Sequence, residues 1–276
     1  MATWEPCSVR VDCPFCGEGK RTETHWHRIA DFIACICLKE RSDRYERACE
    51  ESHKVGLCSF IQFYRAVKNP DLKTDVNIWN SHQAVARHAL SLHAKRLIIL
   101  EDDFQFRRTT LPLTQIEQDV SNLDAYYPSW DIYYLGHFPL LSIPAFPPIR
   151  RVWSQCAHAL VMNDCMIQRL SSLAPKYIQT FSSVFGNGID CYFMLQSKTF
   201  APDKILCVQH ESPNDHRKAS WIDYAITHGW CYDFANSLSR FIPFLFVLVV
   251  FLLLNKKHNK ESRNTRKQQQ ICPSPR

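Results

Sequence analysis

Three acidic residues, Glu101, Asp102 and Asp103, stand together directly after the apolar run 97–100. Adjacent carboxylates repel one another and are costly to bury, so three of them predict a positively charged ligand. Hard oxygen donors favour Mg²⁺ or Mn²⁺, the ions that accompany phosphate groups. A helix N-cap is the alternative, but it would use only one of the acids. We therefore predict a divalent metal site at residues 101–103.

The spacing within this cluster suggests separate roles for its members. Glu101 and Asp103 are two residues apart, the spacing by which many nucleotide-sugar enzymes hold a metal and a ribose. We predict that Asp103 binds the metal directly and that Glu101 contacts the ribose or metal-bound water. Asp102 is predicted either to share in binding this ligand or to have a structural role.

Strands and helices are predicted to alternate through residues 32–210, which indicates an α/β fold with a largely parallel central sheet. Strands are expected at 32–38, 60–67, 97–100, 131–135, 156–162 and 205–208, and helices near Ser42, near Asn77 or Asn80, and after Asn163. Prolines in 138–151 predict a stiff loop. Since ligands bind at the carboxyl ends of strands in such sheets, the acids stand where a ligand is expected.

Composition excludes several classes of protein. The 276 residues include only 7 Gly and neither GxGxxG nor GxxxxGK[ST], which argues against a Rossmann dehydrogenase or a P-loop NTPase. The net charge is +6, and residues 255–276 carry all of it, with seven Lys or Arg against one Glu. The remaining body is neutral, so no nucleic-acid partner is predicted.

Six segments in a fixed order carry a resemblance to a known family. They are ICLKERSDRYERACEE (36–51), NIWNSHQAVARHAL (77–90), RLIILEDDFQF (96–106), WDIYYLG (130–136), CAHALVMNDCMIQRL (156–170) and GIDCYF (188–193). This order resembles that of the family 25 glycosyltransferases, which include bacterial lipooligosaccharide β-galactosyltransferases and collagen galactosyltransferases. The chain departs from the family at Asn77-Ile78, where Gly-Cys is usual, and at His158, where Tyr is usual.

The resemblance implies a GT-A nucleotide-sugar-binding fold and a metal-dependent, inverting transfer of a sugar, galactose in many members, from a UDP-sugar. The acceptor would be a glycan, a lipid or a protein. Asp190 becomes the candidate general base or acceptor-binding acid, and a helix N-cap is its structural alternative. Sequence leaves the sugar, the acceptor and the linkage open.

Further residues receive roles from their positions. Ser81 and His82 match the family's Ser-His pair and are expected to contact the donor, although a buried His bonded to backbone is the alternative for His82. Arg41 and Arg44 follow the first strand and are expected to meet the diphosphate or uridine, with exposed helix-start charges as the alternative. His210, just after the last strand, is a candidate late metal ligand.

Two other functions remain open from the sequence. A metal-dependent phosphodiesterase or nucleotidyltransferase could use the same acids without preferring a nucleotide sugar. Alternatively, the chain could be a catalytically inactive, membrane-tethered binding module, in line with the departures from the family pattern.

The N-terminal extension, residues 1–30, contains a candidate structural zinc site. Cys13 and Cys16 lie in CPFCG, a zinc-knuckle form, and His25 and His27 follow at a spacing that would place them on one face of an extended segment. Free thiols are the alternative, since the 13 Cys of the chain are expected to be mostly reduced. Such a zinc would be separate from the transfer chemistry.

The C-terminal part predicts membrane association. After a glycosyltransferase domain at 31–237, residues 238–254 include the fully apolar run FIPFLFVLVVFLLL, and a basic tail predicted to be disordered follows at 255–276. A helix over this run would be about 21 Å long at about 1.5 Å per residue, short of a hydrocarbon core of about 30 Å. A short anchor or interfacial segment is therefore preferred to a buried helix. The N-terminus has no apolar signal-peptide region, so a cytosolic catalytic body is expected.

Overall fold

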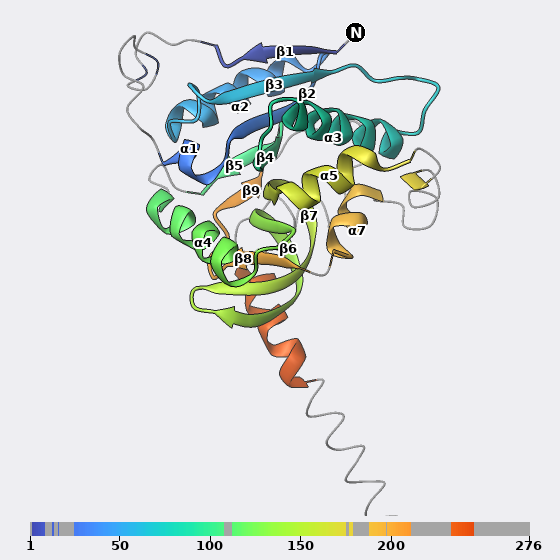
Figure 1. The fold of residues 1–276 in the computed structure, drawn as a ribbon. Coiled ribbons are helices and arrows are strands. Elements are labelled where there is room, and N and C mark those ends of the chain that lie inside the picture. The colour runs from blue at the N-terminus through green and yellow to red at the C-terminus, as the bar shows by residue number, and fades with distance from the viewer. Residues whose placement is uncertain are drawn as a thin grey trace, which may run out of the picture.

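The structure is a computed structural model that describes residues 2–8, 13, 16, 25–107, 112–174, 177–178, 188–196, 198–210 and 233–245. Its centre is a seven-stranded sheet in the order β1-β3-β2-β4-β7-β6-β8 (Figure 1). The strands are β1 Thr3–Pro6, β2 Phe32–Leu38, β3 Ile61–Ala66, β4 Arg96–Glu101, β6 Ile132–Phe146, β7 Ile149–Asn163 and β8 Thr199–Pro202. A second, two-stranded sheet pairs β5 Phe104–Phe106 with β9 Cys207–Gln209.

Helices connect the strands and cover the sheet. They are α1 Trp26–Ile29, α2 Ser42–Lys54, α3 Thr74–Ser91, α4 Leu113–Tyr126, α5 Asp164–Ser172 and α7 Gly188–Met194. As predicted, Asn163 caps α5, and its side chain accepts a hydrogen bond from the Met166 N–H. Ser42 was expected to cap α2, but it is the first helical residue, and Arg41 takes the cap position without a side-chain bond.

The predicted α/β fold is confirmed, but the sheet is mixed rather than largely parallel. β3, β2 and β4 are parallel neighbours, and so are β6 and β8. β1 and β7 run antiparallel to their neighbours. The strand-helix alternation holds only through β4; the direct turn from β6 into β7 forces an antiparallel pair.

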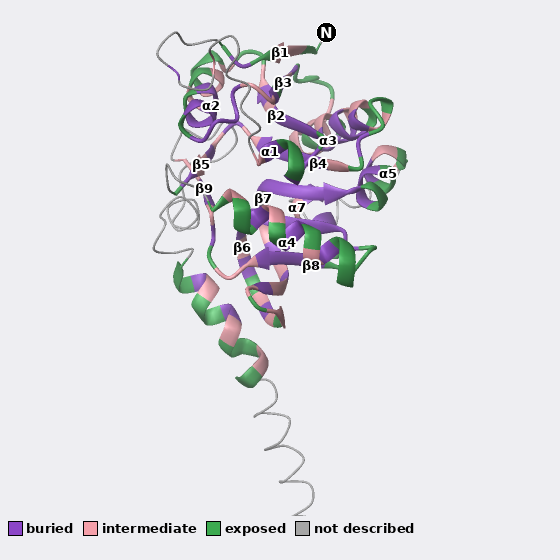
Figure 2. Ribbon diagram, turned by 60° about the vertical axis from the view of Figure 1, so that its left-hand side comes forward, coloured by how far each residue is buried: buried purple, intermediate pink, exposed green. Residues whose placement is uncertain are grey.

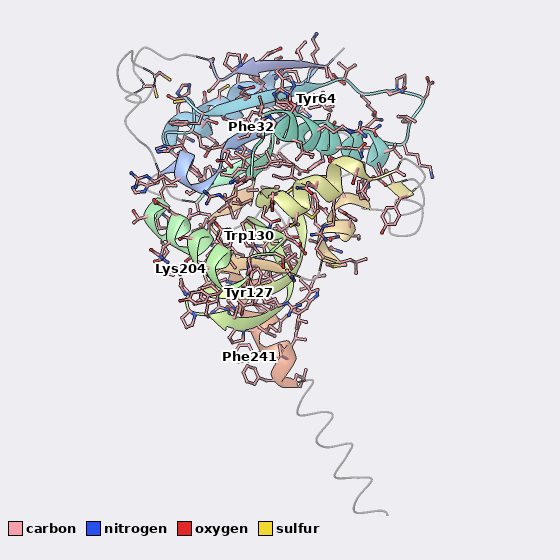
Figure 3. The ribbon with its side chains drawn as sticks, viewed as in Figure 1. Phe32, Tyr64, Tyr127, Trp130, Lys204 and Phe241 are labelled. Atoms are coloured by element: carbon pink, nitrogen blue, oxygen red, sulfur yellow. The ribbon has the colours of Figure 1, made fainter. Side chains whose placement is uncertain are left out.

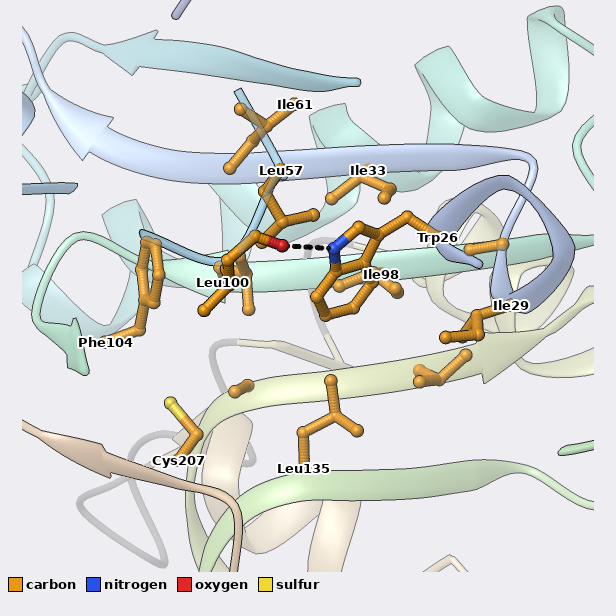
Figure 4. Close-up of a cluster of buried hydrophobic side chains, with 14 of the residues drawn as sticks. Trp26, Ile29, Ile33, Leu57, Ile61, Ile98, Leu100, Phe104, Leu135 and Cys207 are labelled. Carbon is orange, nitrogen blue, oxygen red and sulfur yellow. Dashed lines mark hydrogen bonds between the residues drawn. The ribbon is translucent and has the colours of Figure 1, made fainter. Parts of the chain in front are cut away.

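Strand alternation divides the apolar side chains between two cores. On β2, Ile33 and Cys35 face a core with α1, α2 and α4, whereas Phe32 and Ala34 face a core with α3, α5 and α7. Buried residues accordingly run along both sides of the sheet (Figure 2). Figure 4 shows the first core, in which the Trp26 indole donates to the Val55 carbonyl at 2.9 Å. Because both faces of the sheet are packed against helices, the residues at the ends of its strands have a well-defined position.

The proline-rich stretch predicted as a loop is part of a long β-hairpin. β6 and β7 pair from Ile132 to Phe146, with register shifts after Pro139 and Pro144. Proline has no N–H for the ladder, so it is tolerated at such irregularities. The prediction was wrong because it counted prolines without allowing for bulged strands.

Gly136 in β6 permits a close approach that no other residue would allow. A Cβ there would lie 2.6 Å from the Cys207 carbonyl oxygen and would also collide with the His158 ring. The missing side chain therefore lets β9 lie against β6 and β7. The position of β9 matters because Gln209, its last residue, hydrogen-bonds to Asp103 of the acidic cluster.

Residues 233–245 form a helix that projects from the body (Figures 1 and 3). Its start is held by Arg107, which forms a bidentate ion pair with Asp233 at 2.6 and 2.7 Å, and by the Asn236 and Arg240 side chains, which donate to the Asp203 carbonyl. Among the described residues, no helix has the length and apolar character needed to cross a bilayer. The rest of the predicted anchor, 246–254, and the tail lie outside the described residues.

Candidate functional site

A pocket of about 660 Å³ opens where the parallel strands β2, β3 and β4 end. Leu38, Ala66 and Glu101 are the last residues of these strands, and all three line it. Side chains from α2, α3, α7, β7 and β9 complete its wall. Carboxylates outnumber basic groups there. The carboxylates are those of Asp75, Glu101, Asp102, Asp103 and Asp190, and the basic groups are those of Arg44 and Lys68.

Asp102 is committed to an ion pair. The Arg44 Nη1 group donates to its Oδ1 at 2.8 Å, and the two side chains are only 13% and 9% exposed. A buried carboxylate needs such a partner, so this ion pair agrees with the structural alternative for Asp102. Arg44 reaches the pocket from α2 and thereby fixes the first turn of that helix to the end of β4.

Asp103 is the acid least satisfied by the protein. Its Oδ2 accepts a hydrogen bond from Gln209 at 3.3 Å, but its Oδ1 is buried without a hydrogen-bond partner among the described residues. Burial, and then the charge of Asp102, raise the pKa of Asp103 to about 7. A carboxylate in this condition favours a proton or a metal ion.

Glu101 shares this electrostatic strain. Burial, followed by the charges of Asp103 and Asp190, raises its pKa well above the ordinary value, although 28% of its side chain is exposed. The charge effect of Asp190 also indicates that α7 brings this acid near the end of β4. Repulsion among these three carboxylates would be relieved by a bound cation.

His82 is buried and bonded to the backbone, the alternative that the sequence offered, and it also lines the pocket. Its Nδ1 lies 3.0 Å from the Ile78 carbonyl, which can only accept, so Nδ1 carries the proton. Burial lowers the pKa of His82 to about 4, which keeps the ring neutral near pH 7. Nε2 then faces Glu101 Oε1 at 3.7 Å, and both side chains line the pocket.

Ser81 lines the same wall one residue earlier. Its hydroxyl donates to the Asn77 carbonyl at 2.9 Å, which leaves the oxygen lone pairs as the polar feature presented to the pocket. The Asn77 side chain, which replaces the glycine typical of the resembling family, holds the preceding loop by bonding to Asn69 in both directions. This departure is therefore structurally supported.

Asp190 lies in the first turn of α7 and lines the pocket opposite the β4 acids. The predicted alternative of a cap before the helix does not hold, because α7 begins at Gly188. Cys156 also lines the pocket and has a φ of 59°, a left-handed conformation that is uncommon for a residue with a side chain. Such strain concentrates at functional sites.

Gln209 is a pocket residue that sequence reasoning missed. It reaches Asp103 because β9 pairs with β5, which follows the acids directly. The two residues are separated by 106 positions, so no local pattern could reveal the contact. The only signal in the sequence was that Gln209 is a polar residue directly after the last predicted strand, 205–208.

Two predicted site residues lie outside the pocket lining. Arg41 forms a bidentate pair with Asp43, at 2.8 and 2.7 Å. His210 follows β9, and its backbone N–H donates to the Asp103 carbonyl at 2.6 Å, so it supports the acidic turn through its main chain.

The predicted zinc ligands separate into two groups. Cys13 and Cys16 lie together, but His25 Nδ1 bonds to Glu117 at 2.6 Å and the His27 ring lies against Phe60. The proposed Cys13–Cys16–His25–His27 set was wrong because residues 26–29 form a helix, α1, instead of an extended segment. Two residues from α2 and its following turn replace the histidines, as described below.

No protein-family model and no curated protein matches the chain. Among solved structures, a glycosyltransferase involved in glycosylation of the major capsid of PBCV-1 is 9% identical, with a TM-score of 0.42, over 66% of this chain and 93% of that one. A Bacillus anthracis protein assigned as a glucose-1-phosphate thymidylyltransferase, crystallised with sucrose, is 10% identical, with a TM-score of 0.37, over 75% and 76%. These scores indicate a loose likeness of fold and carry no argument about function.

Proposed function

We propose that the chain is a metal-dependent glycosyltransferase that uses a nucleotide-sugar donor, with a UDP-sugar as the donor to test first. One observation carries the proposal. Asp103 lies just beyond the carboxyl ends of three parallel strands, and its Oδ1 atom is buried without a hydrogen-bond partner among the described residues, inside a pocket large enough for a ligand of this class. The resemblance to family 25 motifs agrees with it.

The donor set fits Mn²⁺ or Mg²⁺. Asp103 and Glu101 offer hard oxygen ligands, and their pKa values are raised first by burial and then by the negative charge of neighbouring carboxylates. Among the described residues, no three pocket acids have ligand atoms within 4.8 Å of one another. Three protein ligands are not required, because Mg²⁺ in such sites is usually bound by one or two carboxylates together with the substrate phosphates. When bound, such a metal supplies a Lewis acid that stabilises a departing diphosphate.

The remaining pocket residues have roles that follow from their positions. Asp190 would accept the proton of the acceptor hydroxyl, because it faces the β4 acids from a separate element. Lys68, from the loop after β3, and the Ser81 oxygen, from α3, would contact the donor. Arg44 would act through Asp102 by holding the acidic turn in place. Inversion at the anomeric carbon is part of the proposal, as a single displacement needs one base.

The test is UDP release from a panel of UDP-sugars by the full chain, with and without added Mn²⁺. We expect turnover of one donor that requires the metal, and a loss of about 100-fold or more in Asp103→Asn. Asp71→Asn, an exposed acid at the loop before α3, is the matched control and should keep full activity. Metal binding with no UDP from any donor would overturn the proposal. Release of a nucleoside monophosphate would favour the phosphodiesterase alternative.

We also propose that helix 233–245 and the following segment meet a membrane surface. Phe241, Phe244 and Leu245 are 67%, 71% and 61% exposed on a helix that projects from the body, as Phe241 in Figure 3 illustrates. Removal of residues 238–276 should abolish sedimentation with vesicles that contain anionic lipid. Unchanged sedimentation of the truncated chain would contradict this.

A further inference from the structure

Four side chains that could ligate a metal converge near the edge of the sheet, away from the acidic pocket. They are those of Cys13, Cys16, His53 and Cys58, and their ligand atoms all lie within 4.8 Å of one another. The first two belong to the N-terminal extension, His53 to the last turn of α2, and Cys58 to the turn before β3. Among the described residues, no other group of this kind occurs.

The distances fit a tetrahedral site. Cys58 Sγ lies 3.7 Å from Cys13 Sγ and 3.4 Å from Cys16 Sγ, and Cys16 Sγ lies 3.3 Å from His53 Nδ1. With zinc–sulfur bonds of about 2.3 Å and a zinc–nitrogen bond of about 2.1 Å, tetrahedral geometry places sulfurs about 3.8 Å apart and sulfur and nitrogen about 3.6 Å apart. A disulfide would require about 2.05 Å, so these sulfurs are not covalently joined.

His53 is oriented for ligation by its second nitrogen. Nε2 lies 2.9 Å from the Ser8 carbonyl, which only accepts, so Nε2 carries the proton and Nδ1 keeps its lone pair. Nδ1, which carries this lone pair, is the ring atom that faces the thiols. A carbonyl bonded to the outer ring nitrogen is the usual support of a metal-bound histidine.

The surroundings identify the metal. His53, Cys13 and Cys58 are 7%, 9% and 8% exposed, so the site is largely closed to water. Three soft thiolates and one imidazole select zinc over the hard ions suited to the pocket acids. A fifth thiol, Cys7, lies 3.7 Å from His53 Nε2, the protonated nitrogen, and is therefore placed outside the ligand set.

We propose that Cys13, Cys16, His53 and Cys58 bind one structural Zn²⁺. Binding would release the three thiol protons to solvent and form four bonds to the metal, with no change in oxidation state. The site would join the N-terminal extension to α2 and to the start of β3, across a separation of 45 residues between Cys13 and Cys58. It would thus secure β1, a four-residue edge strand that pairs only with β3 in the described sheet.

The test is elemental analysis of the purified full chain and its variants. We expect one zinc per chain in the parent, in Cys7→Ser and in the double variant His25→Gln/His27→Gln, and a loss of zinc in Cys58→Ser and in His53→Gln. Zinc lost from the His25/His27 variant but retained in the other two would overturn the ligand set.

A second measurement covers the case in which the cysteine variants do not fold. In the parent, chelation by a strong zinc ligand should release one zinc and make three further thiols reactive towards a thiol reagent. Replacement by Co²⁺ should give the visible absorption of a tetrahedral thiolate site. A folded parent without zinc, or a mass that shows two of these cysteines oxidised to a disulfide, would overturn the proposal.

Discussion

The acidic pocket and the cysteine cluster lie at opposite ends of α2, which links them. Arg44 in its first turn reaches the pocket, and His53 in its last turn joins the cluster, about 14 Å away at about 1.5 Å per residue. The pocket presents hard oxygens that repel one another and stand open to a ligand. The cluster presents soft sulfurs, nearly closed to water and directed at one point.

The pocket is therefore arranged to bind and release a ligand, whereas the cluster is arranged to hold one metal ion permanently. An open site with unsatisfied charge lowers stability until its ligand arrives, while a closed four-ligand site raises stability by joining distant segments. Neutralising the strained acid Asp103 should therefore stabilise the metal-free protein, whereas removing a ligand from the cysteine cluster should destabilise it. The following predictions test that contrast, beginning with the largest expected effect.

Loss of the cysteine cluster should destabilise the fold strongly. Cys58→Ser removes one proposed zinc ligand, and we expect the free energy of unfolding to fall by about 4 kcal/mol or more, because metal binding and folding are coupled. Urea unfolding of parent and variant, each purified in the presence of zinc, measures this. Cys165→Ser, at an exposed cysteine in α5, is the control and should change stability by about 0.5 kcal/mol or less. A Cys58→Ser protein as stable as the parent would contradict a stabilising metal site at the cysteine cluster.

Breaking the Arg44–Asp102 ion pair at the pocket should also be costly. Arg44→Ala leaves Asp102 buried without its cation, which typically costs about 3–5 kcal/mol. The matched variant Arg41→Ala removes a pair with exposed Asp43 and should cost about 1 kcal/mol or less. Thermal and urea unfolding compare the two. Adding Asp102→Ala to Arg44→Ala should recover part of the loss; if it recovers none, repulsion around an orphaned Asp102 is not the cause.

Removal of the charge on Asp103 should stabilise the metal-free protein in a pH-dependent way. The folded-state pKa of about 7 lies above the ordinary 3.8, so the folded state binds more protons between these values, and the parent loses stability as pH rises through them. Asp103→Asn should therefore exceed the parent by about 1–3 kcal/mol at pH 8 and match it near pH 4.

The measurement is urea unfolding across this pH range without added divalent cation. Added Mn²⁺ should narrow the difference at pH 8, because only the parent gains stability from binding it. A constant difference at all pH values would show that the Asp103 charge is not under strain.

The smallest effect is expected at a supporting residue. Gln209→Ala removes the donor to Asp103 Oδ2 and should lower metal affinity and donor turnover about tenfold, since outer partners of metal ligands usually act at this level. Turnover titrated with Mn²⁺ measures it: a positioning role predicts a shift to higher metal concentration, and Gln209→Glu should shift the pKa of the site upward as well. An unchanged metal titration would assign Gln209 to packing alone.

The two sites also differ in how far sequence could predict them. Residues 101–103 are contiguous and follow an apolar strand, so their position at the sheet edge followed from local pattern. Arg44 was found from its position after the first strand, and Ser81, His82 and Asp190 from the resembling motifs. For the cysteine cluster, the sequence predicted two of the four side chains, Cys13 and Cys16, but not His53 and Cys58. Cys13 and Cys16 stand in a recognisable turn, but their partners lie 37 to 45 positions away without any shared spacing.

The amino-acid sequence by itself predicted strands at β2, β3, β4, β6, β7 and β9, helices at α2, α3 and α5, and the acidic turn, because these depend on periodicity and on adjacent residues. It did not predict β1, β5, β8, α1 or α4. Tertiary structure decided which acid was neutralised, which was left strained, and which histidine joined the thiols. It also converted the proline-rich stretch into a hairpin and brought Gln209 to Asp103. These outcomes depend on contacts between distant segments and on burial, which local spacing does not encode.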